Sequence, residues 1–137
     1  MIRLGVDLGG RRVGLAVSDP DGRLAVPAGH AVVASADEAL DAVDAAARRH
    51  GAAEIVLGLP RRLDGRDGPA ARAVRLFADR CRGRGWTVLL WDERLTTGEA
   101  ERALKDAKLS RRARGGVVDS VAAQRILASY LERVARR

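Results

Sequence analysis

Three acidic residues stand where the pattern of the chain predicts the end of a strand or the start of a helix. Asp7 comes near the end of an alternating apolar stretch, Glu93 follows a continuous apolar run, and Asp119 opens the last helical pattern. Ligands of open α/β sheets bind beyond the carboxyl ends of the central strands, where these side chains could converge. Converging carboxylates need a cation to offset their repulsion, and oxygen ligands suit Mg²⁺ or Mn²⁺ better than zinc. The acids therefore indicate a hard-metal site.

A site of this kind would hydrolyse a phosphodiester bond. A pair of such ions about 3.5 to 4 Å apart activates a water molecule and stabilises the leaving oxygen, and this displacement needs no histidine. The structural alternative assigns the three acids to a strand-end turn, an exposed surface and a helix cap. Spacing alone does not decide between these two interpretations.

The charge of the chain favours a polyanionic partner. It has 25 Lys and Arg residues against 18 Asp and Glu, a net charge of +7 and a pI near 11.0. That balance favours nucleic acid over an anionic membrane surface. Aromatic residues make up only 3% of the chain, so we expect recognition of phosphates and shape rather than base stacking.

Two further observations concern the compartment. No apolar run reaches the roughly 18 residues of a membrane span, and residues 1–3 lead into a strand pattern without a signal-peptide core. Cys81 is the only cysteine, which excludes intramolecular disulfides and cysteine-rich zinc sites. It shares a helical face with Val74 and Phe77, so we expect it in the core. The expectation is a cytoplasmic protein with no membrane partner.

The elements that would position the acids follow from changes in the period of the apolar residues. Residues 2–8 and 13–17 alternate, and a third apolar stretch covers about 24–33, which is typical of three antiparallel strands. Continuous apolar runs at 55–57 and 88–91 predict two parallel central strands. Helical patterns cover 36–50, 69 to about 83, 96 to about 107, and 118–134. We therefore expect one domain over 1–137, a mixed five-stranded α/β sheet with helices on both faces.

Four segments resemble the YqgF (RuvX) family, and they follow one another at family-like spacing over almost the whole chain. They are residues 5–19, which read GVDLGGRRVGLAVSD, Gly58-Leu-Pro with Asp64-Gly65, Trp91-Asp-Glu-Arg-Leu-Thr-Thr97, and Val118-Asp-Ser-Val-Ala-Ala123. The family is similar in fold to the Holliday junction resolvase RuvC. Its members are described as candidate resolvases and as nucleases that mature the precursor of small-subunit ribosomal RNA. The resemblance implies an RNase H-like fold.

The resemblance also implies that Asp7, Glu93 and Asp119 are the catalytic acids and hold Mg²⁺ or Mn²⁺. The partner it implies for this protein is nucleic acid, either an rRNA precursor or branched DNA, with ribosomal particles as a further partner. We expect a metal-dependent endonuclease that matures the 5′ end of pre-16S rRNA, with Holliday junction resolution as the alternative. Monomer and homodimer both stay open, because only junction resolution favours a two-fold dimer.

Two positions depart from the family pattern. Members often carry a lysine after the first Asp-x-Gly, where this chain has Arg11 and Arg12. They often carry another lysine two residues before the last aspartate, where this chain has Val117. The first difference keeps the positive charge and the second loses it.

Eight residues are candidates for contacting the nucleic acid, because they lie in loops or turns near the acids. They are Arg11, Arg12, Arg61, Arg62, Arg94, Thr97, Arg111 and Arg112. Gly9-Gly10 could let the backbone approach a phosphate, or could form a hairpin turn that needs positive φ. The arginines along the polar side of the helix at 69–83 are expected to be a solvated face.

Two rival classes remain. Asp7-Leu8-Gly9-Gly10 also resembles the first phosphate loop of the sugar kinase and actin fold. Proteins of that fold enclose ATP between two domains, whereas this chain has one domain and no second Asp-x-Gly loop. The other rival is a nucleic-acid-binding protein without catalysis, which would bind RNA or junctions without metal-dependent cleavage.

Overall fold

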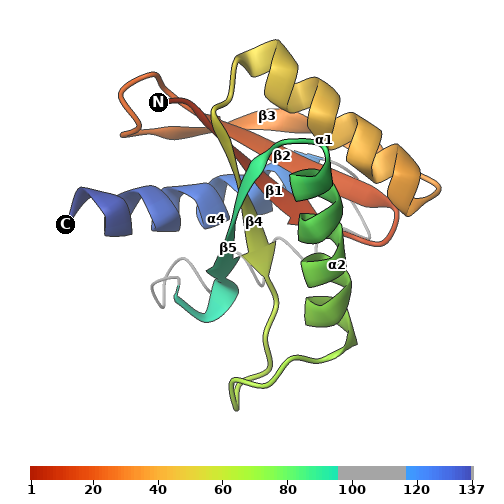
Figure 1. Ribbon diagram of the computed structural model, residues 1–137. Coiled ribbons are helices and arrows are strands. Elements are labelled where there is room, and N and C mark those ends of the chain that lie inside the picture. Colours follow the sequence, from red (N-terminus) through yellow and green to blue (C-terminus); the bar gives the residue numbers. More distant parts are fainter. Residues whose placement is uncertain (96–116, 137) are drawn as a thin grey trace.

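A twisted five-stranded sheet forms the centre of the molecule. The computed structural model describes residues 1–95 and 117–136, with Leu95 and residues 117–119 described by backbone alone. The strands are β1 (Arg3–Leu8), β2 (Arg12–Ser18), β3 (Ala25–Val32), β4 (Glu54–Leu59) and β5 (Thr87–Asp92), in the order β3-β2-β1-β4-β5 (Figure 1). β1, β2 and β3 are antiparallel, while β4 and β5 run parallel to β1. The predicted mixed sheet is confirmed.

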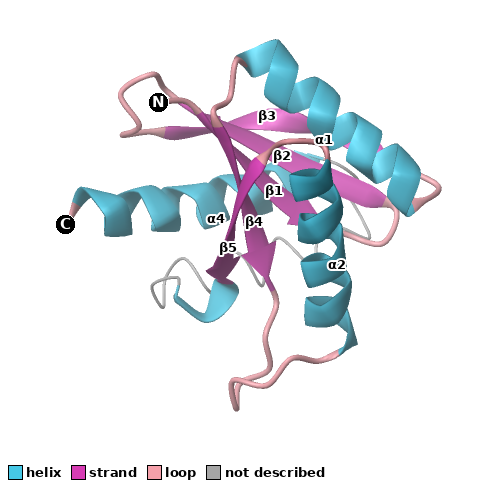
Figure 2. Ribbon diagram, in the orientation of Figure 1, coloured by secondary structure: helices cyan, strands magenta, loops and turns pink. Residues whose placement is uncertain are grey.

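Helices cover both faces of this sheet, as predicted. α1 (Ala36–His50) and α2 (Pro69–Gly83) pack on one face, and α4 (Val117–Ala135) packs on the other (Figure 2). A single 3₁₀ turn, η1 (Glu93–Leu95), follows β5. The helix predicted over 96–107 lies outside the described residues. Among the described helices, none is long and apolar enough to cross a membrane.

The helix boundaries follow from local chemistry. Ser35 Oγ accepts the backbone N–H of Glu38 at 3.1 Å, which caps α1, and Gly51 ends that helix with φ of 67°. Pro69 occupies the first turn of α2, where its missing N–H costs nothing. The start of each helix and the end of α1 therefore have a local chemical cause.

The two faces of β1 differ as its alternation predicts. Leu4 and Val6 are buried in the larger core, which α1 and α2 cover. Gly5 faces α4, because a Cβ atom built on it would lie 2.7 Å from the Cβ of Leu127. The second core, beneath α4, contains the fully buried Ala16 and Ile126 among its members. A polar residue on the α4 side of β1 therefore lies between the sheet and this helix.

Cys81 is a core residue of α2, as predicted, and its chemistry follows from its burial. Burial raises the pKa of its thiol to about 11, so very little thiolate forms near neutral pH. We expect no measurable alkylation by iodoacetamide at pH 8 in the native protein, and complete alkylation in guanidinium chloride. Intact-mass spectrometry checks both. Rapid labelling of the folded protein would contradict this burial.

Candidate active site

Asp7 lies at the carboxyl edge of β1, on the face that α4 covers. Its side chain alternates with Leu8 and Val6 and so shares a face with Gly5 and Arg3. The guanidinium of Arg3 stacks over the ring of Tyr130 in α4, with Cζ 5.4 Å from the ring centroid. Asp7 is only 6% exposed, which is unusual for an acid and excludes a simple solvated turn residue.

Glu93 reaches the same face from the other side of β4. It begins η1 immediately after β5, and β4 separates β5 from β1 in the sheet. Gly58 of β4 has no side chain, and a Cβ atom built there would lie 3.6 Å from Cγ of Glu93 and 2.5 Å from Cδ1 of Ile126 in α4. The Glu93 side chain therefore lies over Gly58, on the α4 side of the sheet. Asp7 and Glu93 share one face and one edge.

Asp119 belongs to the helix that covers this face. Along β1, Arg3 meets Tyr130 and Gly5 meets Leu127 and Ala123, so α4 runs in the direction opposite to β1. One helical turn before Ala123, the backbone of position 119 therefore lies toward the edge of the sheet that holds Asp7. The described residues contain no group of three His, Cys, Asp or Glu side chains close enough to hold a metal ion. The side chain of Asp119 is outside that description.

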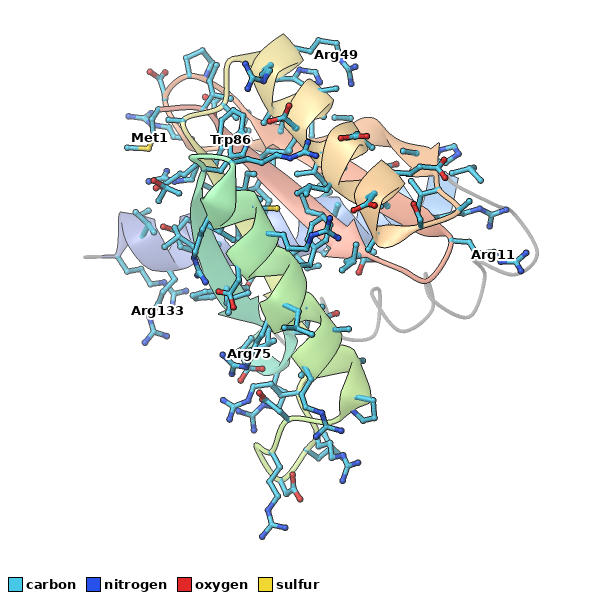
Figure 3. All side chains as sticks on the ribbon, turned by 45° about the vertical axis from the view of Figure 1, so that its right-hand side comes forward. Met1, Arg11, Arg49, Arg75, Trp86 and Arg133 are labelled. Carbon is cyan, nitrogen blue, oxygen red and sulfur yellow. The ribbon has the colours of Figure 1, made fainter. Side chains whose placement is uncertain are left out.

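The predicted phosphate-binding arginines fall into two groups. Arg11 and Arg62 are exposed and form no ion pair with any described side chain, and Figure 3 shows Arg11 projecting away from the ribbon. Arg61 and Arg94 instead pair with acids of the chain itself, the nearest contacts being 3.4 Å and 2.6 Å. Arg12 is half-buried in β2. Thr97, Arg111 and Arg112 lie outside the described residues.

Asp92 is one of the acids that hold these arginines. Its carboxylate accepts hydrogen bonds from the Arg94 side chain, which hold the pKa of Asp92 below its usual range. The backbone N–H of Arg94 and the nearby charge of Arg61 act in the same direction. Asp92 is therefore charged at neutral pH and has charged partners within its own chain.

The arginines of α2 are exposed, as predicted for a solvated face. Three of them, and Arg84 directly after the helix, pair with acids; the pairs are Arg75–Asp67, Arg80–Asp37, Arg82–Asp79 and Arg84–Asp41. Figure 3 places Arg75 beside the β4–α2 loop. Much of the positive charge on this helix is therefore offset within the chain.

Gly9 and Gly10 do not form the turn with positive φ that one interpretation required. Neither has a positive φ, and Gly9 donates its N–H to the carbonyl of Arg12 at 2.9 Å. A Cβ atom on Gly10 would meet nothing within 4 Å, so packing does not demand glycine there. Both residues line an apolar pocket of about 390 Å³ between α1 and α2. Asp7 and Glu93 do not line that pocket, so it is separate from the acids.

The comparison with protein families decides to which family the chain belongs. The family model described as RuvX, Holliday junction resolvase, matches residues 1–133. The chain belongs to the RuvX family. Two similar relatives come from Moorella thermoacetica and Myxococcus xanthus, both 44% identical to this chain. The matches cover 96% of this chain in each case, and 94% and 88% of the respective relatives. Both relatives carry the name "Putative pre-16S rRNA nuclease".

Solved structures show that this chain shares the RNase H-like fold of RuvC. Thermus thermophilus RuvC in complex with a Holliday junction substrate aligns with a TM-score of 0.57 at 17% identity, covering 98% of this chain and 96% of that chain. The fowlpox virus resolvase in complex with Holliday junction DNA aligns with a TM-score of 0.60 at 12% identity, covering 98% and 99%. Both alignments span nearly the whole of this chain, so the likeness concerns its overall fold.

Proposed function

We propose that this protein is a metal-dependent endonuclease that cleaves structured nucleic acid, with 5′-end maturation of pre-16S rRNA as its function. The observation that carries the proposal is the convergence of Asp7 and Glu93 on one face of the sheet, at one edge, beneath the helix that contains Asp119. The names of the 44% identical relatives support an rRNA precursor as substrate.

The donor set fits a hard divalent cation. Asp7 and Glu93 offer carboxylate oxygens, and Asp7 is 6% exposed, so a cation there would offset charge that is largely removed from water. Asp7, Glu93 and Asp119 would hold Mg²⁺ or Mn²⁺. When bound, such an ion lowers the pKa of a water molecule and neutralises charge on the phosphate. The overall reaction would be hydrolysis, in which a phosphorus–oxygen bond to water replaces the one to the leaving oxygen and that oxygen takes up a proton.

The remaining residues would hold the backbone of the substrate. Arg11 lies in the β1–β2 loop next to the edge with Asp7, and Arg62 lies in the β4–α2 loop that leaves the same edge. Their guanidinium groups are exposed and make no ion pair within the described ranges, so they can bind phosphate. Arg12, Thr97, Arg111 and Arg112 are proposed to add to this surface. Binding would weaken steeply with salt.

Branched DNA is the second candidate substrate. It is favoured by the description of the family and by the two resolvases whose solved complexes contain Holliday junctions. We propose a cytoplasmic location without a membrane partner and association with ribosomal particles. A monomer suffices for RNA trimming, whereas symmetric junction cleavage needs a homodimer.

Parallel cleavage assays test the proposal. The purified protein is incubated with a labelled pre-16S rRNA fragment or a four-way DNA junction, in Mn²⁺, Mg²⁺ or EDTA. Metal-dependent cleavage of the RNA is expected, and paired symmetric cuts in the junction would instead support the resolvase. Salt-dependent binding of both substrates without any cleavage would overturn the nuclease proposal in favour of a binding protein.

A further inference from the structure

The chain beyond β4 and the chain beyond β5 are tied together by Asp92. Leu59 and Asp92 are register partners, so both segments leave the sheet at the same place. Nη1 of Arg61 lies 3.6 Å from Oδ2 of Asp92, and Nη2 of Arg94 lies 2.6 Å from the same oxygen. The Asp92 side chain is only 13% exposed. It is therefore held between two guanidinium groups.

Arg61 is 32% exposed, but its guanidinium group is directed at acceptors of its own chain. Its Nε lies 3.4 Å from Oδ1 of Asp67, and its Nη2 donates to the carbonyl of Gly65. That Nε is buried and makes no hydrogen bond in the described part of the chain. Each of the three guanidinium nitrogens thus faces an acceptor of the same chain. Arg61 closes the β4–α2 loop over the end of β5.

Arg62 provides the contrast. It is the next residue and carries the same charge, but its side chain is exposed and has no acid partner among the described residues. Only its backbone is engaged, because its N–H donates to the carbonyl of Arg66 at 3.0 Å. Two adjacent arginines therefore have different surroundings, and within the described ranges only Arg62 is left to bind an external anion.

Glu93 lies inside the turn that Asp92 and Arg94 form. Oδ1 of Asp92 accepts the backbone N–H of Arg94 at 2.9 Å, a side-chain turn that encloses the single residue between them. This turn sets the direction in which Glu93 leaves β5, over Gly58. The network thus reaches the acid through the backbone.

We propose that Arg61 and Arg94 are positioning residues that act through Asp92 to orient Glu93, and that neither is a phosphate ligand. The inference rests on the proposed role of Glu93 as a metal ligand. Groups that orient metal ligands typically change metal affinity by about 10- to 100-fold when they are removed. A phosphate ligand instead contributes to the salt dependence of nucleic-acid binding, by roughly 0.7 to 0.9 in the log–log slope.

These two signatures separate the roles in one experiment on the full chain. Arg61→Gln, Arg61→Lys and Asp92→Asn are compared with Arg62→Gln as the matched control. Isothermal titration calorimetry measures Mn²⁺ affinity without nucleic acid. Binding of a four-way junction and of a pre-16S rRNA fragment is measured in EDTA across a salt series. Thermal melting shows that each variant folds.

We expect Arg61→Gln and Asp92→Asn to weaken Mn²⁺ binding about tenfold or more while the salt slope stays that of the wild type. Arg61→Lys should weaken it too, because an ammonium group cannot face Asp92, Asp67 and the Gly65 carbonyl together. Arg62→Gln should do the reverse, lowering the salt slope with Mn²⁺ affinity unchanged. If Arg61→Gln fails to fold, the lysine and Asp92→Asn variants decide.

The opposite result would overturn the inference. In that case Arg61→Gln keeps its Mn²⁺ affinity but lowers the salt dependence of nucleic-acid binding, and Arg61→Lys restores that salt dependence. Arg61 would then be a phosphate ligand. Glu93→Gln separates this failure from that of the proposed function. If Glu93→Gln binds Mn²⁺ like the wild type, the metal site itself is wrong. If it loses Mn²⁺ while Arg61→Gln and Asp92→Asn retain it, only the positioning role is wrong.

Discussion

Asp7→Asn is expected to lower metal-dependent cleavage by at least about a thousandfold, because loss of one carboxylate removes charge where the phosphate transition state must be stabilised. Asparagine has nearly the same shape, so the fold should persist. In the wild type, Mn²⁺ at about a hundred times its dissociation constant should add roughly 2.7 kcal/mol to the free energy of unfolding. In Asp7→Asn most of this increment should disappear.

Single-turnover cleavage and thermal melts with Mn²⁺ or EDTA measure both effects. Asp21→Asn is the matched control, because Asp21 is an exposed acid in the turn between β2 and β3, at the other end of β2. It should retain both cleavage and the Mn²⁺ response. Wild-type cleavage by Asp7→Asn would remove this acid from the catalytic set and support the structural interpretation of the three acids.

Gly5→Ala is expected to cost about 2 to 3 kcal/mol of stability, near the upper end of the usual range for an overpacked core. Its new Cβ would lie 2.7 Å from the Cβ of Leu127 and 3.0 Å from the carbonyl oxygen of Ala123. Neither atom is the end of a flexible side chain, so relief requires α4 to move away from β1. Because α4 carries Asp119, cleavage should fall together with stability.

Urea denaturation measures the loss of stability, and substitutions at two other glycines serve as comparisons. Gly10→Ala should be close to neutral, since its Cβ meets nothing within 4 Å and its φ is not positive. Gly58→Ala should cost less than Gly5→Ala, because the nearest atom is Cδ1 of Ile126, which can rotate away. If Gly5→Ala and Gly10→Ala have the same free energy of unfolding, α4 does not pack against β1 as closely as described.

The fold follows from the sequence where a local signal determines it. The alternation in β1 assigns Asp7 and Gly5 to one face, and the Ser35 and Pro69 signals begin helices where the structure has them. The close approach of α4 to the sheet is harder to predict from the sequence. It depends on Gly5 and Gly58 lying beneath the same helix, and a glycine within a strand pattern indicates close approach without naming the neighbour.

The candidate site shows the same division. The ends of two strands and the start of a helix could be assigned to Asp7, Glu93 and Asp119 from the order of apolar and polar residues alone. The distinction between Arg61 and Arg62 could not, because neighbouring arginines look alike in sequence. What separates them is Asp92, which lies at the end of the next strand along the chain and is brought to Arg61 by the pairing of β4 with β5.

The packing of α4 onto the sheet also bears on when the protein can act. All five strands precede α4 in the chain, so during synthesis Asp7 and Glu93 leave the ribosome before Asp119 and its helix. Until then Gly5, Ala16 and Val56 form an uncovered apolar strip, which chaperones could bind. A nascent chain at that stage holds two of the three acids. On the proposed role of Asp119, nuclease activity would begin only after α4 has been translated and has docked.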